Sequence, residues 1–570
     1  MKRISAILCA VSLLLTLFAA CDNSPAATTQ PTTRAEAQTT AAPATQTETL
    51  PPETTPPETY YQANGSTTAG GITVYTDYSA YEPSAGSGVK FTRLREGPLD
   101  TFEPSDDYGG VYPYAASRVY ISDEDGNAWE FGHLYGFADR NGCILTDGIF
   151  VDVEPMVRDD YMTGEFFTQP FWITSRYDNP VVHYEEEWNY KWVEADRHCG
   201  VISMDGSLAL PDDYVYVEPL SEGFVCTRDR KDRIMDVYDG QGRFCFSTDQ
   251  VMNPGDDVWD ISYGDGLYLL ASSVYYSGYG MKDEGWFLDR EGNRVLGPYT
   301  EAEAFREGLA CVSLDGEKYG FIDKTGKMVI EPEYRYPGAF RDGVALMETQ
   351  DGRWVLLDKA GNRLLEFPQN SWVNLADCGI RAEYNNGTAA FFSLDGTVLA
   401  QGNNDLSCLD EDTFYTGEGD KTKIFRTDGT ELIIDKIDWM SPAAAVLDGE
   451  VVLGYRGEIY DNNTGRFCFV RRDLSAWYPN FPEKGTVPGQ ANYYYSSSIQ
   501  DQLTGEIWYL AWAKDGWIIV KADGTQARIP LQTADPVLRG DRIMGLTNRA
   551  CIYLDLEGNV VFSYPLDAED

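Results

Sequence analysis

The residues most able to do chemistry in this 570-residue chain are few and poorly placed for catalysis. Of the three histidines, only His198 stands beside a nucleophile, Cys199. Neighbouring residues of a strand point to opposite faces, so this pair is badly oriented for thiol–imidazole chemistry. The glycines Gly320 and Gly326 enclose five residues, whereas a phosphate-binding loop has four. The sequence therefore predicts a protein that is not an enzyme and that binds no cofactor.

Carboxylates are abundant but form no recognisable catalytic or metal-binding motif. The segment 123–127 begins like a calcium loop but lacks the remaining ligand positions and the distal Glu, so we interpret it as a hairpin turn. A glycosidase needs two carboxylates about 5–10 Å apart. With 90 acidic residues in the chain, the sequence nominates no such pair and no metal site. An enzyme that degrades glycans or cell wall with carboxylates in a propeller channel is the alternative interpretation.

Aromatic residues offer the better indication of binding. They gather in insertions between repeated segments, and insertions in repeat proteins map to loops on one face, often the binding face. Aromatic rings in such loops can stack on sugars or anchor a protein partner. The alternative is that these rings only cover the ends of the repeated units. The candidate binding residues are Phe171, Trp172, Trp188, Tyr276, Tyr279 and Tyr494.

The charge balance excludes one large class of partner. The formal net charge is −45, from 90 acidic and 45 basic residues spread along the chain. Phosphate-rich partners are repelled by such a surface, so we expect no binding to DNA or RNA. The acidity favours solubility and can attract cations or basic partners.

The cysteines are expected to be mostly free thiols in the core. Eleven cysteines are present, and nine remain after Cys9 and Cys21 of the N-terminal segment are set aside. An odd number in an exported chain argues against a complete disulfide framework. Many lie in apolar runs, as in Phe244-Cys245-Phe246, where a free cysteine behaves as a small buried hydrophobe.

The N-terminus has the layout of a secretory signal peptide over residues 1–20. Lys2 and Arg3 precede an apolar run that is shorter than the roughly 20 residues of a membrane span. The segment Leu17-Phe18-Ala19-Ala20-Cys21 resembles the lipobox of bacterial lipoproteins, with Phe18 where Leu is usual. The resemblance implies acylation of Cys21 and anchoring to the outer face of the cytoplasmic membrane. Residues 21–71, rich in Thr and Pro, are predicted to form a disordered tether.

Repetition dominates residues 72–570. Gly308 and Gly343 are 35 residues apart in similar segments, and so are Gly326 and Gly361. An Asp-x-x-Gly turn recurs at Asp139, Asp239, Asp289, Asp323, Asp358 and Asp555. Each unit of about 35 residues reads as short apolar strands separated by turn signals. We therefore predict an all-β repeat protein made of three- to four-stranded antiparallel units.

The strands of each unit are apolar on both faces, as in 309–314, so every unit must be covered on both sides. Radial stacking of such units gives a β-propeller, and linear stacking gives a solenoid. We favour the propeller-like array. About eleven glycine markers exceed the usual four to eight blades, so two propellers, partial blades or an open array are all compatible with the sequence.

The repeated pattern resembles the WG repeat of bacterial proteins. Residues 299–332 and 334–364 carry it best, with Phe-x-Glu-Gly-Leu-Ala, an aromatic–Gly pair and Phe-Ile-Asp-Lys-x-Gly-Lys. Tyr319-Gly320 stands where the family has Trp-Gly. The resemblance implies a propeller-like fold and a binding or scaffold role. Together with the expected anchor and the absence of catalytic motifs, it leads us to expect a cell-surface protein that binds a protein, a peptide or a wall glycan. The resemblance implies no catalytic residue.

Overall fold

The computed structural model contains a compact unit, Thr45–Asp570, that is separate from Met1–Ala44. Cys21 and the expected signal peptide lie outside the described residues, as does most of the expected tether. The residues that the structure describes are 46–47, 66–69, 72–75, 104–122, 128–146, 148–159, 166–185, 190–229, 233–252, 257–276, 280–376, 378–447, 450–461, 464–481, 498–513, 516–529, 536–546 and 550–565.

The described chain is almost entirely β-strand, with the short helices η2 (Asp106–Tyr108) and α1 (Thr248–Val251). Three short strands precede the repeated sheets: β1 (Gln46–Thr47), β2 (Ser66–Ala69) and β3 (Ile72–Tyr75). The sheets before residue 300 contain β4 (Val111–Ser122) and β5 (Ala128–Asp139); β6 (Asp152–Asp159), β7 (Phe166–Glu185), β8 (Tyr190–Ser203) and β9 (Ala209–Tyr214); β10 (Tyr216–Pro219), β11 (Phe224–Asp229), β12 (Ile234–Tyr238) and β13 (Phe244–Ser247); and β14 (Asp257–Gly264), β15 (Leu267–Tyr276), β16 (Gly280–Leu288) and β17 (Arg294–Tyr299).

The next four sheets contain β18 (Glu301–Ala302), β19 (Leu309–Ser313), β20 (Tyr319–Asp323) and β21 (Met328–Tyr334); β22 (Phe340–Arg341), β23 (Val344–Glu348), β24 (Trp354–Asp358) and β25 (Arg363–Glu366); β26 (Trp372–Ala376), β27 (Gly379–Glu383), β28 (Thr388–Phe392) and β29 (Val398–Asn403); and β30 (Ser407–Asp410), β31 (Thr413–Glu418), β32 (Lys421–Arg426) and β33 (Glu431–Asp435). The last three contain β34 (Trp439–Leu447), β35 (Glu450–Asp461), β36 (Thr464–Arg471) and β37 (Ala476–Phe481); β38 (Ser498–Gln500), β39 (Ile507–Ala513), β40 (Gly516–Val520) and β41 (Gln526–Ile529); and β42 (Val537–Arg539), β43 (Arg542–Leu546), β44 (Ala550–Leu554) and β45 (Val560–Pro565).

Each four-stranded sheet is an antiparallel meander whose strands pair in chain order. The β34–β37 sheet gains a fifth strand, because β1 pairs with β37 in parallel. The β4–β5 sheet has two strands, and isolated bridges at Phe150 and Ile144 extend its pairing. The arrangement is that of a β-propeller, which confirms the all-β class and the four-stranded repeating unit.

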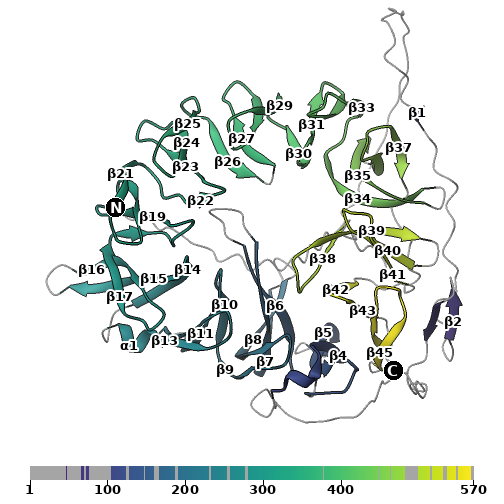
Figure 1. Ribbon diagram of the computed structural model, residues 1–570. Coiled ribbons are helices and arrows are strands. Elements are labelled where there is room, and N and C mark those ends of the chain that lie inside the picture. The colour runs from purple at the N-terminus through teal and green to yellow at the C-terminus, as the bar shows by residue number, and fades with distance from the viewer. Residues whose placement is uncertain are drawn as a thin grey trace, which may run out of the picture. The chain divides into compact units, whose positions relative to one another are not determined.

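The sheets follow one another in chain order in Figure 1, and apolar clusters join consecutive sheets. Leu309 and Phe321 of one sheet, for example, pack against Ala345 and Val355 of the next. Similar clusters join every consecutive pair from the β4–β5 sheet to the β42–β45 sheet. The last sheet then packs on the first through one further cluster, beside which β4 and β45 lie together in Figure 1. The two apolar faces of each unit are thus both covered.

The Asp-x-x-Gly segments form the turns that the sequence predicted. At Asp323, the main-chain N–H of Gly326 donates to the Asp323 carbonyl at 2.9 Å. The Asp323 carboxylate accepts from the N–H groups of Thr325 and Lys327 at 2.9 and 3.1 Å. The Thr325 hydroxyl and these N–H groups lower the pKa of the Asp323 carboxyl. Gly326 has φ +81°, a conformation that glycine adopts without strain.

A buried arginine links the sheets at the closure between the last and first sheets. Arg539, at the end of β42, is 3 % exposed. Its Nε donates to Gln502 Oε1 at 2.7 Å, and its Nη1 donates to the carbonyl of Pro113 and to the Tyr553 hydroxyl. The guanidinium carbon lies 5.1 Å from the ring centre of Trp172. One side chain thereby connects three sheets and a loop of a fourth.

We predict that Arg539→Met lowers the melting temperature. The substitution keeps an unbranched stem but removes one of the two donors to the Pro113 carbonyl and leaves the partly buried Gln502 Oε1 without a donor, at a cost of about 1–3 kcal/mol for such a group. Arg353→Met is the control, because its ion pairs with Asp351 and Glu366 are exposed and such pairs contribute at most about 1 kcal/mol. Differential scanning calorimetry measures both, and equal melting temperatures for the two variants would contradict the role of Arg539.

Candidate functional site

Acidic residues recur in the turn between the first and second strands of successive sheets, here called the first turn. In three of the described sheets this turn has an acidic residue followed by glycine with positive φ at both residues: Asp265-Gly266, Glu307-Gly308 and Asp342-Gly343. The φ values are 52° and 91°, 53° and 91°, and 52° and 82°. This is the type I′ geometry, which favours short polar residues and glycine.

The first turns are hydrogen-bonded to one another across sheets. The carboxylate of Asp265, in the preceding first turn, accepts from the N–H of Gly308. The carboxylate of Glu307 accepts in turn from the N–H of Gly343 at 3.0 Å. Each acidic side chain therefore reaches the glycine of the following sheet.

Cations from another turn approach the same acidic residues. The turn between the third and fourth strands, here called the third turn, has a cation at its second position in several sheets. Lys359 Nζ lies 2.8 Å from Glu307 Oε2, and Lys324 Nζ donates to the carbonyl of Asp265. Elsewhere, Arg472 in the third turn of the β34–β37 sheet pairs with Asp410, and Arg140 in the turn after β5 pairs with Asp541. In each case the cation reaches back to the preceding sheet.

The β26–β29 sheet departs from this pattern. Its third turn reads Ser393-Leu394-Asp395-Gly396, so a leucine stands where Lys324 and Lys359 stand in the two preceding sheets. The acidic residue that a lysine at this position would approach is Asp342. Its side chain is 68 % exposed, and among the described residues its one ion pair is with Arg341, Nε to Oδ2 3.6 Å.

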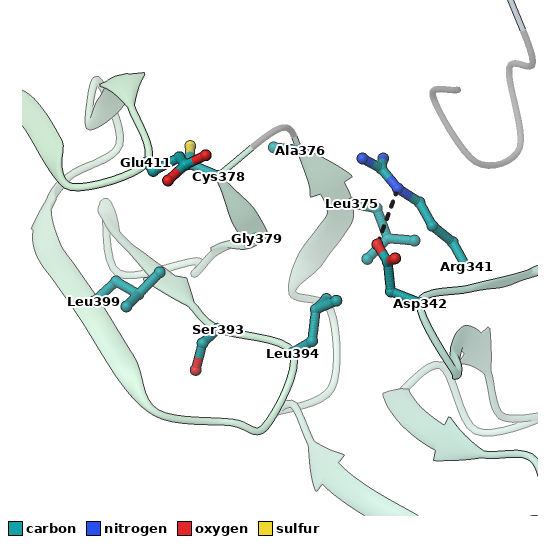
Figure 2. A pocket seen from close by; sticks show the side chains of 10 residues that line it. All are labelled: Arg341, Asp342, Leu375, Ala376, Cys378, Gly379, Ser393, Leu394, Leu399 and Glu411. Atoms are coloured by element: carbon teal, nitrogen blue, oxygen red, sulfur yellow. Dashed lines mark ion pairs between the residues drawn. The ribbon is translucent and has the colours of Figure 1, made fainter. Parts of the chain in front are cut away.

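A pocket of about 280 Å³ opens at this departure (Figure 2). It extends from the first turn of the β22–β25 sheet across the β26–β29 sheet to Glu411 in the first turn of the β30–β33 sheet. Leucines line part of its wall, and the carboxylates of Asp342 and Glu411 come from its two flanking sheets. The lining residues are Arg341, Asp342, Leu375, Ala376, Cys378, Gly379, Ser393, Leu394, Leu399 and Glu411.

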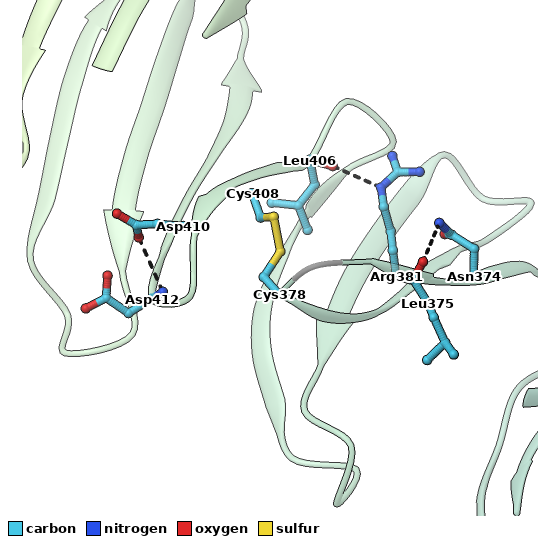
Figure 3. The surroundings of a disulfide bond; sticks show 8 residues. All are labelled: Asn374, Leu375, Cys378, Arg381, Leu406, Cys408, Asp410 and Asp412. Atoms are coloured by element: carbon cyan, nitrogen blue, oxygen red, sulfur yellow. Dashed lines mark hydrogen bonds between the residues drawn. A yellow bond between two sulfur atoms is a disulfide. The ribbon is translucent and has the colours of Figure 1, made fainter. Parts of the chain in front are cut away.

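A disulfide lies at one side of the pocket (Figure 3). Cys378, which lines the pocket, is bonded to Cys408 of β30, so the bond joins two consecutive sheets. The other seven described cysteines are free, and five of them are buried. The expectation of mostly free core thiols is confirmed by the five buried free cysteines, and Cys378 and Cys408 are exceptions to it. Their 30-residue separation is close to one repeat, so the pair occupies neighbouring units.

We predict that dithiothreitol lowers the melting temperature of the protein. A crosslink over 30 residues stabilises by about 3–4 kcal/mol in the loop-closure account. The double variant Cys378→Ser/Cys408→Ser should melt at the lower temperature with or without the reductant. An unchanged melting temperature on reduction of the unmodified protein would show that the disulfide does not stabilise it.

The candidate aromatic residues do not form one described surface. Phe171 and Trp172 lie in β7 and are 2 % and 0 % exposed. Phe171 packs edge-on against Phe224, and the Trp172 indole N–H donates to the carbonyl of Val111 at 2.9 Å. Both rings are therefore core residues. Tyr276 is the last residue of β15, and the structure describes only its backbone. Trp188, Tyr279 and Tyr494 lie outside the described residues.

Three described carboxyl groups have a raised pKa, and all lie on the first strands of successive sheets. They are Glu154 on β6, Glu218 on β10 and Asp260 on β14. Desolvation raises the pKa of Glu154 to about 7, and the neighbouring Asp152 contributes. Desolvation also raises the pKa of Glu218 and Asp260, while the guanidinium of Arg158 partly opposes it. A carboxyl group that titrates near neutral pH can act as a general acid.

Sequence reasoning missed the pocket. The signal was available in an alignment of the third turns, since Asp323-Lys324-Thr325-Gly326 can be compared directly with 393–396. The sequence does not show that the lysine side chains of these turns, Lys324 and Lys359, extend toward the preceding sheet. Within the described part of the chain, no cluster of ligating residues suits a metal ion, and no helix is long and apolar enough to span a membrane.

Residues 319–354 match the family model of the WG containing repeat, which supports a WG-repeat protein. No curated protein sequence matches this chain. Among solved structures, BamB from Moraxella catarrhalis is 12 % identical, over 60 % of this chain and 94 % of that chain, with a TM-score of 0.24. Hsv2 from Kluyveromyces lactis is 9 % identical over 52 % and 98 %, with a TM-score of 0.26. AztD from Citrobacter koseri is 11 % identical over 57 % and 95 %, with a TM-score of 0.25. These scores are too low to carry an argument about function.

Proposed function

We propose that this protein is a binding or scaffold protein of the bacterial cell surface, built of WG repeats and held to the outer face of the cytoplasmic membrane by a lipid on Cys21. The observation that carries the binding role is the open pocket beside the third turn of the β26–β29 sheet. Carboxylate hydrogen bonds hold the recurring turns in place, as at Asp323 and Asp358. The turns are therefore already ordered before a ligand binds, so binding costs little conformational entropy.

The anchor is supported by the lipobox-like residues that end in Cys21 and by the Thr/Pro-rich segment that follows them. A chain of fifty residues in polyproline conformation reaches roughly 150 Å, at about 3.1 Å for each residue. Such a length could carry the repeated sheets away from the membrane and through a wall layer.

We predict that Cys21→Ser abolishes incorporation of labelled palmitate. The thiol of Cys21 is the proposed acylation site, and serine offers no sulfur. Membrane fractionation and fluorography of cells expressing the full chain measure the result. Cys245→Ser is the control, because that residue is far along the chain and should not affect labelling. Continued labelling of Cys21→Ser would contradict the lipid anchor.

The binding role is tested by retention of the full chain on candidate partners, namely purified wall polysaccharide and surface proteins of the same bacterium. We predict retention without any change in the partner. The competing function is glycan or wall degradation, which the raised pKa of Glu154 favours. Release of soluble sugar from the wall, lost on Glu154→Gln, would establish that function and overturn the binding-only proposal.

A further inference from the structure

We propose that the pocket between the first turn of the β22–β25 sheet and the third turn of the β26–β29 sheet binds the side chain of a lysine from a partner protein or peptide. This inference rests on the binding role proposed above and gives it a ligand chemistry. It follows from a comparison with the third turns of the two preceding sheets, where Lys324 and Lys359 stand at the position of Leu394.

The protein's own lysines provide the precedent for the ligand. In the two preceding sheets, Lys324 and Lys359 extend from the third turn to the first turn of the sheet before. Lys359 thereby leaves the side chain of Glu307 only 32 % exposed. Leu394 takes the place of the lysine in the β26–β29 sheet, and the side chain of Asp342 stays 68 % exposed. The site therefore keeps the first-turn carboxylate, that of Asp342, but lacks the third-turn ammonium group that Lys359 provides to Glu307.

Arg341 does not replace the missing lysine. Its Nε lies 3.6 Å from Asp342 Oδ2, which exceeds the usual 2.7–3.2 Å of an N–H···O hydrogen bond. The two residues are adjacent in the chain, with Arg341 ending β22 and Asp342 opening the first turn (Figure 2). The Asp342 carboxylate thus keeps accepting capacity for an external donor.

The size and lining of the pocket fit one lysine side chain. At about 280 Å³ it falls below the roughly 300–1,000 Å³ of small-molecule sites. Leu375, Leu394 and Leu399 supply apolar surface for a four-carbon stem, which lysine buries while its ammonium group stays at a polar edge. The carboxylates of Asp342 and Glu411 come from two different sheets. The assignment to lysine follows the precedent of Lys324 and Lys359, which occupy the equivalent position in the two preceding sheets.

The net charge of the chain favours the same partner chemistry. At −45, the protein attracts basic surfaces and raises the rate at which they are encountered. Because this attraction acts on any cation, it does not by itself distinguish the pocket from the rest of the surface. A test must therefore separate the local site from the general charge.

The test uses the full chain and the peptide acetyl-Gly-Lys-Gly-amide at physiological ionic strength, with binding measured by saturation-transfer NMR. We expect binding to the unmodified protein and at least tenfold weaker binding when norleucine replaces the peptide lysine. Leu394→Lys should weaken binding at least tenfold, because it places an internal ammonium group at Asp342. Ala522→Lys is the matched control. It adds the same charge at the second position of the third turn in the β38–β41 sheet, and we expect less than a twofold change.

A second variant guards against misfolding. Asp342→Asn keeps a residue type that tolerates the positive φ of 52°, removes the charge and should also weaken binding at least tenfold. Equal binding by Leu394→Lys and Ala522→Lys, or equal binding of the lysine and norleucine peptides, would overturn the proposal. Tighter binding of the corresponding arginine peptide would overturn the assignment to lysine.

The outcome is separable from that of the proposed function. If a surface protein is retained equally by the unmodified chain and by Leu394→Lys, the pocket assignment is wrong while the binding role stands. If the lysine peptide binds as expected but no wall or surface component is retained, the pocket assignment stands and the cell-surface role fails.

Discussion

The whole structure depends on covering sheets that are apolar on both faces. In β19, all five residues from Leu309 to Ser313 are buried, so this strand cannot have a solvent-facing side. A four-stranded meander of this kind is not stable alone, because burial of its second face needs a neighbour. Each sheet therefore requires the next, and the last sheet must find a partner as well. The cluster that joins the β42–β45 sheet to the β4–β5 sheet meets this requirement.

The same constraint applies at the closure, where a buried arginine adds to the apolar packing. Neighbouring repeats bury leucine, valine and phenylalanine against one another, as Leu356 and Val373 do. At the closure, two ends of the chain of different sequence meet, and the β4–β5 sheet has only two strands. The guanidinium of Arg539 and the hydroxyl of Tyr553 satisfy the carbonyl of Pro113 there. Directional hydrogen bonds can fix the register of two surfaces that repetition does not match, whereas apolar contacts alone are less specific.

Much of the fold was predictable because it depends on short sequence patterns, each of which determines one turn or strand. The turn at Asp323–Gly326 follows from one acidic residue and one glycine at a fixed spacing, and it recurs wherever they recur. The features that were missed depend on which residues of different sheets come together. Cys378 and Cys408 are about one repeat apart, but so are many residues that never touch. Phe171 and Trp172 looked like loop aromatics because β7 is 20 residues long and obscures the repeat; the structure places both rings in the core.

The candidate site was hidden for a related reason. In a repeat protein, a residue that recurs at the same position of every unit is usually required for packing. A position at which one unit differs from its neighbours is one where packing does not determine the residue. Leu394 is such a position, and the structure shows that the departure has a consequence across the sheet boundary at Asp342. The charge pairing of the first and third turns is exposed, so each pair adds little to stability. Loss of one lysine therefore costs the fold little and leaves a carboxylate beside an apolar wall. A repeated scaffold can in this way open an acidic pocket at a single unit without disturbing the sheets on either side.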